Sequence, residues 1–133
     1  MVGGLLVVLV LAFAAYVRFA PLPVEQWHVP VTARADADRA DGAARILQGG
    51  AQKFEGLNQA MANMARTRVL AGSLESGRIT YVTRSAVFGF PDLTTIERVG
   101  DEIRLHARLR FGASDLGVNR KRLEGLIATV QGG

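Results

Sequence analysis

The chain has 133 residues, of which 49% are hydrophobic and 21% charged, the composition of a single globular domain. Its 16 basic and 12 acidic residues give a net charge of +4, too small an excess to indicate nucleic-acid binding by itself. The absence of cysteine excludes thiolate catalysis, disulfides and cysteine-ligated metal sites.

An uninterrupted apolar segment opens the chain. Residues 1–17 carry no charged side chain, and a helix continued to Ala20 approaches the ~30 Å thickness of the hydrocarbon core of a bilayer. Arg18 lies where it can reach the lipid headgroups, and Trp27 is suited to the membrane interface. We therefore predict a single transmembrane anchor over residues 1–20.

Two alternatives compete with this anchor. A cleaved secretory signal would fit the small residues of Ala12-Phe13-Ala14, although the segment lacks a basic n-region. A buried core helix is disfavoured, because the apolar run starts at Met1 and is not interrupted. The nearest basic residues, Arg18 and Arg34, follow the segment, which by the positive-inside rule weakly favours a cytoplasmic domain.

Residues 21–42 are predicted to form a linker with little fixed structure. Their Ala/Asp/Arg tract imitates a calcium-binding loop, but the spacing of its acids is wrong by one residue. Leu47 also stands where such a loop needs a bidentate glutamate. Ala43–Gln48 is suited to one short strand, so the folded domain is expected to span residues 43–133.

The helices and strands of the domain are predicted from the spacing of its hydrophobic residues. Phe54, Leu57, Met61 and Met64 recur at three- and four-residue spacing, which predicts a helix. From Thr67 the period changes to two, which predicts antiparallel strands over residues 67–72, 80–85, 94–99 and 102–111.

A final helix is expected to begin at Ser114 as its N-cap, with Asp115 placed favourably for the helix dipole. Its apolar stripe runs from Leu116 to Val130. The sequence therefore predicts an α+β fold: a transmembrane helix, then a small two-layer domain with a four- to five-stranded antiparallel sheet packed by two helices.

Two specific stretches, residues 80–92 and 110–122, are predicted to meet. Asn119 and Arg120 fall on the stripe of the last helix that should be apolar, so they need polar partners. Asp92 and the carbonyls of the preceding turn are the candidates. A structural joint is the favoured interpretation and a ligand site the alternative, for a cluster of Arg84, Phe88, Gly89, Pro91, Asp92, Arg110, Ser114, Asp115, Asn119 and Arg120.

The same stretches carry a resemblance. "ITYVTRSAVFGFPDLTTIE", "ARLRFGASDLGVNRKRLEGLI" and "QWHVP" are similar to the DUF1499 family of uncharacterised bacterial and plastid proteins, over roughly residues 25–130. The resemblance implies an architecture, but it implies no mechanism, because the family has no established activity. Because members of the family are often anchored or exported, it implies a single-pass protein of a bacterial inner membrane with a periplasmic domain.

Enzymatic chemistry is poorly represented in the sequence. "GASDLG" misses the nucleophile elbow G-x-S-x-G by one residue, and the two histidines, His28 and His106, have no ligand spacing. We therefore predict no catalytic residue, no metal site and no cofactor.

A basic sheet face is the better-motivated binding feature. If the predicted strands align, one face carries Arg78, Arg84, Arg104, His106, Arg108 and Arg110. Such a face could bind anionic lipid, although a solvated face of a two-layer domain would carry charge as well. The prediction is a membrane-anchored, non-enzymatic binding or accessory module. Its partners would be the bilayer and an anionic lipid, a small ligand or a larger membrane protein complex, but not nucleic acid.

Overall fold

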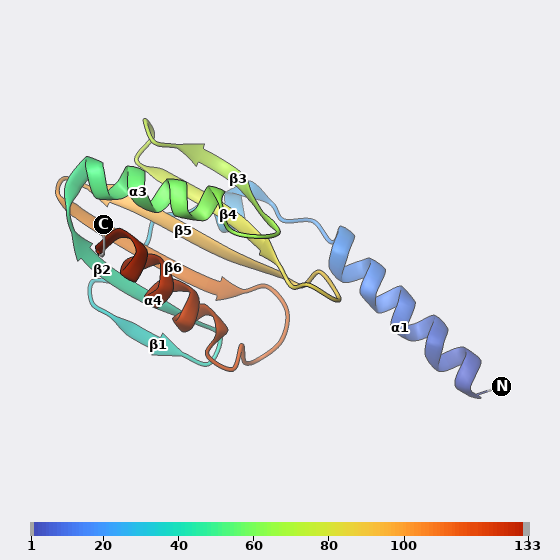
Figure 1. The fold of residues 1–133 in the computed structure, drawn as a ribbon. Helices are drawn as coiled ribbons and strands as arrows, with labels where there is room; N and C mark the ends of the chain where they lie inside the picture. The colour runs from blue at the N-terminus through green and yellow to red at the C-terminus, as the bar shows by residue number, and fades with distance from the viewer. Residues whose placement is uncertain (1, 132–133) are drawn as a thin grey trace.

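The computed structural model describes residues 2–131 and has an α+β fold, as predicted (Figure 1). An N-terminal helix extends away from a layered domain in which one sheet is packed by helices. In chain order the elements are α1 (Val2–Phe19), α2 (Val24–Trp27), β1 (Ala37–Arg39), β2 (Gly42–Gln48), α3 (Gly50–Ala62), β3 (Thr67–Ser73), β4 (Arg78–Arg84), β5 (Pro91–Val99), β6 (Glu102–Leu109) and α4 (Val118–Gln131).

The sheet has six antiparallel strands in the order β1-β2-β6-β5-β4-β3. The four strands predicted from the period of two are its β3 to β6, and the short strand predicted at residues 43–48 is β2. The sixth strand, β1, lies in the predicted linker. Its formation depends on side-chain contacts rather than on a hydrophobic period: Asp36 accepts a hydrogen bond from the Ile46 amide, and Asp38 pairs with Arg45 at 2.8 Å.

One face of the sheet is covered by α3 and α4 and forms the hydrophobic core (Figure 1). Because side chains alternate along a strand, every second residue of β4, β5 and β6 points into this layer. Phe54, Leu57 and Met61 of α3 meet Leu123 and Leu126 of α4 above the sheet. The predicted stripes therefore pack, except that Leu116, predicted to open the stripe of the last helix, lies before α4 and is exposed.

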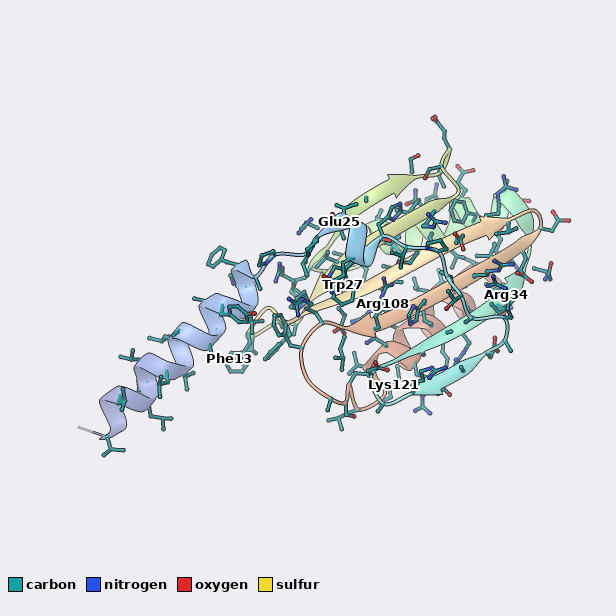
Figure 2. All side chains as sticks on the ribbon, turned by 180° about the vertical axis from the view of Figure 1, so that it is seen from behind. Phe13, Glu25, Trp27, Arg34, Arg108 and Lys121 are labelled. Atoms are coloured by element: carbon teal, nitrogen blue, oxygen red, sulfur yellow. The ribbon has the colours of Figure 1, made fainter. Side chains whose placement is uncertain are left out.

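The opposite face of the sheet is covered too, which differs from the prediction of a free linker over residues 21–42. The stretch around α2 lies across β4, β5 and β6, with Trp27 next to Arg108 (Figure 2). The His28 ring forms a hydrogen bond of 2.8 Å with the Thr80 hydroxyl. The backbone amide of the buried Val31 donates a hydrogen bond to the Glu97 carboxylate. We call residues 20–34 the strap. Sequence periodicity does not reveal it, because single side chains and backbone groups hold it in place.

Among residues 2–131, one helix is long and apolar enough to cross a membrane, and a signal sequence would meet the same criteria. This helix, α1, contacts the domain at its C-terminal end. Phe13 packs against Phe90 with ring centroids 6.1 Å apart, and Tyr16 packs edge-on against Phe111 at 5.7 Å. Val17 is completely buried, whereas the apolar residues nearer the N-terminus are exposed.

Candidate functional site

The turn between β4 and β5 lies at the end of the sheet from which α1 departs (Figure 1). Ser85 accepts a hydrogen bond from the Phe90 amide, and its own amide donates to the Phe90 carbonyl. Gly89 adopts a φ of 73°, which favours glycine, and its carbonyl accepts a hydrogen bond from Arg84 at 2.9 Å. Arg84 therefore binds the turn through a backbone carbonyl and not through Asp92.

Asp92 pairs with Arg122 at 3.2 Å, not with the predicted Arg120. Arg122 also donates a hydrogen bond to the side chain of Asn119, which is completely buried. Arg120 is half-exposed and lies 3.9 Å from Glu124. Asp92 and the start of the last helix are therefore linked through Arg122, and Arg120 does not take the predicted place.

The reason for this exchange is the face of the last helix on which each arginine lies. Arg122 is largely buried beside Asn119 and Leu123, whereas Arg120 is half-exposed on the other side of the stripe. The helix starts at Val118 rather than after Ser114. Asp115 does the capping, because its carboxylate accepts hydrogen bonds from the amides of Gly117 and Asn119. Burial alone would raise the pKa of Asp115, but these bonds and one from the Asn119 side chain lower it.

The surroundings of Asp92 stabilise its charged form less than those of Asp115 do. Burial raises its pKa above the ordinary value, and Arg122 opposes the shift only in part. Its side chain is 17% exposed and that of Arg122 is 12% exposed, so the pair is largely screened from water. A pair of this kind holds two segments together and has little room for a ligand between its members.

A cavity of about 640 Å³ lies beside this joint, between the β4–β5 turn and the loop before α4. Arg66, Arg84 and Arg122 line it, together with hydroxyl groups such as those of Ser85 and Ser114. Its apolar wall consists of Phe13, Phe90, Leu109, Phe111 and Val118. The volume lies within the ~300–1,000 Å³ typical of small-molecule sites. Cations and aromatic rings thus share one concave surface.

A second, wholly apolar groove adjoins the first cavity. Leu9, Val10, Phe13, Phe88 and Phe90 line it over a volume of about 340 Å³. Phe13 and Phe90 belong to both hollows, so the arginine-lined cavity adjoins an apolar groove along α1. We call the two hollows together the anchor-end site.

Cations are concentrated around this site. Arg84 has a lowered pKa, caused first by burial and then by the charges of Arg68 and Arg18. The Nε–H of Arg66 donates a hydrogen bond to the backbone carbonyl of Arg84. Within residues 2–131, none of these four arginines lies within 4.0 Å of a carboxylate. Sequence reasoning missed Arg18, Arg66 and Arg68 as site residues, since Arg18 lies on α1 and the other two lie at or just before the start of β3, far from it in the sequence.

The six predicted members of the basic sheet face do not form one open surface. Arg78 pairs with Glu97 at 2.6 Å, and Arg104 pairs with Glu102 at 2.5 Å. Arg108 is only 8% exposed, because it donates hydrogen bonds to the Trp27 carbonyl at 2.5 Å and to the Thr95 hydroxyl at 2.8 Å. The face predicted to bind lipid is therefore largely occupied by the strap.

The remaining members of that face are also engaged. Arg110 lies over the Phe111 ring at 4.6 Å and near the Trp27 ring at 5.9 Å. Burial lowers the pKa of His106 to about 4, and the charge of Arg108 adds to the shift. His106 is therefore neutral at physiological pH and contributes no charge to a basic surface.

No cluster of three or more metal-ligating side chains occurs in the part of the chain that the structure describes. The sequence model of a family described as "Protein of unknown function (DUF1499)" matches residues 20–130. No curated protein matches the chain.

Proposed function

The chain belongs to the DUF1499 family, and from that premise we propose that it is a membrane-anchored, non-enzymatic binding module for an anionic phospholipid. The observation that carries the proposal is the anchor-end site. It joins unpaired guanidinium groups to an apolar groove at the point where an apolar helix meets the domain.

The arginine-lined cavity suits a phosphate headgroup. A guanidinium has five N–H donors, and Arg84 uses one of them on the Gly89 carbonyl while Arg66 uses one on the Arg84 carbonyl. The remaining donors of both residues are available to a ligand in the cavity that they line. The two acids of the cavity do not compete, because Asp92 is engaged by Arg122 and Asp115 by the start of α4.

The apolar groove suits an acyl chain. It continues from the cavity along α1 toward the N-terminus, past Phe13 to Val10 and Leu9. If α1 spans a bilayer, this direction leads into the hydrocarbon core. A lipid with its headgroup near Arg84 would then lie in its ordinary orientation, with its chain beside the helix.

The proposal requires that α1 is retained rather than cleaved as a signal sequence. The buried Val17 and the ring contacts of Phe13 and Tyr16 support retention, because they make the end of α1 part of the domain's packing. We also place the domain on the periplasmic side of a bacterial inner membrane, which the family resemblance implies. Protease added to spheroplasts would digest residues 21–133 if this topology is right and would spare them if the domain is cytoplasmic.

The proposal predicts that full-length protein released from membranes retains one anionic phospholipid. Native mass spectrometry should detect it, and phosphatidylglycerol should bind better than phosphatidylcholine. Since a cation near a lipid surface contributes ~1 kcal/mol, the double variant Arg66→Gln, Arg84→Gln should bind about 30-fold more weakly.

Two controls accompany this measurement. The double variant Arg66→Lys, Arg84→Lys keeps both charges, so it should retain most of the lipid affinity. It should do so even if the loss of the Arg84 hydrogen bond to Gly89 loosens the β4–β5 turn. Arg98→Gln removes an exposed cation at the far end of the sheet and should leave lipid binding unchanged. Equal binding by wild type and the double Gln variant, with both folded, would refute the lipid site. A stoichiometric protein partner without lipid would favour an accessory subunit instead.

A further inference from the structure

We propose that the domain docks onto the bilayer through two loop tips, which insert beside α1. The tips are the β4–β5 turn, with Val87 and Phe88, and the loop before α4, with Leu116. This inference rests on the proposed membrane anchor but does not depend on a lipid in the cavity.

Both tips expose large apolar side chains at the same end of the sheet. Val87 is 79% exposed, Phe88 is 48% exposed and Leu116 is 87% exposed. Figure 1 shows the β4–β5 turn and the β6–α4 loop at the end of the domain from which α1 extends. Tyr16 and Phe19, at the end of α1, are exposed there as well. Apolar residues gathered at one end of a domain indicate an interaction surface.

Leu116 provides a separate reason to assign a role to this end. It is one of two described non-glycine residues with a positive φ, at 54°. A leucine in this conformation is strained, and no burial within the domain offsets the strain, because the side chain is almost fully exposed. Insertion of the side chain into a bilayer would remove its apolar surface from water.

The charges around the tips identify the bilayer as the partner. Arg18, Arg68 and Arg84 lie close enough together that the first two lower the pKa of the third. Arg18 also lies against the β4–β5 turn, since a Cβ at Gly89 would be 3.1 Å from its guanidinium. Apolar tips surrounded by guanidinium groups match hydrocarbon beneath anionic headgroups. The end of α1 places this surface at the depth of the membrane interface.

The chain lacks cysteine, so one introduced thiol can report the depth of each tip. Phe88→Cys and Leu116→Cys are labelled with an environment-sensitive fluorophore in the full chain, reconstituted in nanodiscs of phosphatidylcholine and phosphatidylglycerol. The matched control is Val99→Cys, because Val99 is 49% exposed and lies at the opposite end of β5. Lipids that carry a quencher on the acyl chain should remove most of the emission at positions 88 and 116, and little at position 99.

Equal quenching at positions 88, 116 and 99 would overturn the docking proposal. If the Phe88 substitution disturbs the turn, Val87→Cys provides the same reading from a more exposed position. The docking proposal and the lipid-site proposal can be refuted independently. Loss of retained lipid with normal quenching refutes only the lipid site, whereas retained lipid with no quenching refutes only docking.

Discussion

Asp92→Ala is expected to destabilise the domain strongly, with a fall in melting temperature of about ten degrees or more. Removing one partner of a fully buried ion pair costs ~3–5 kcal/mol, and the small exposure of this pair reduces the expected cost to ~2–4 kcal/mol. In a domain of this size each kcal/mol corresponds to several degrees. The loss would be large beside a total stability of ~5–15 kcal/mol. Thermal unfolding followed by circular dichroism measures it.

The chain offers a matched control for this prediction. Arg122→Ala should cost a similar amount, and the double variant with Asp92→Ala should cost less than the sum, because both residues belong to one pair. Arg120→Ala removes a half-exposed guanidinium two positions away and should cost under ~0.5 kcal/mol. A neutral or stabilising Asp92→Ala would contradict the joint and would favour a ligand role for this acid.

Arg108→Gln is the second substitution with a large expected effect. As a member of a solvated basic face, Arg108 could be replaced without loss of stability. In the structure it is buried, and its loss would leave the Trp27 carbonyl without this donor. The Thr95 hydroxyl would lose one of two partners, because it also bonds the Thr80 hydroxyl. An unpaired buried group costs ~1–3 kcal/mol, so we expect a loss of ~1–3 kcal/mol. Hydrogen exchange should also accelerate over residues 24–33, because the strap loses its central contact.

Arg104→Gln is the control for Arg108. Both residues lie on the same face of β6, but Arg104 pairs with Glu102 on its own strand and holds no other segment. Its substitution should therefore leave exchange in the strap unchanged, whatever its cost in stability. Equal effects of the two substitutions would show that the strap does not depend on Arg108.

The fold could be predicted from the sequence wherever a hydrophobic period was present. The alternation of Ile103, Leu105 and Ala107 identified β6 and the face on which it packs, and the stripe of Phe54, Leu57 and Met61 identified α3. These patterns arise because burial of one face imposes a period on the chain. The joint was also predictable in outline, because a polar residue such as Asn119 on an apolar stripe requires a partner.

The strap and the anchor-end site could not be predicted in the same way. Val31 and His28 bind the sheet through an amide and a ring nitrogen, so they leave no period in the sequence. Arg122 rather than Arg120 meets Asp92, because Arg122 lies on the edge of the α4 stripe that faces this acid. The two arginines lie at opposite edges of the stripe, so its period does not tell which of them reaches Asp92. Only the three-dimensional arrangement brings Arg66 and Phe13 to one cavity.

Photo-crosslinking in native membranes tests the anchor-end site most directly. The probe is an anionic phospholipid with a photoreactive group on its headgroup, and the adducts are mapped on tryptic peptides. The site predicts adducts on peptides 85–98 and 111–120, which contain Ser85 and Ser114 of the cavity. Unlabelled phosphatidylglycerol should displace these adducts, and phosphatidylcholine should not. Adducts confined to residues 1–18, or displaced equally by both lipids, would contradict a specific site for anionic lipid.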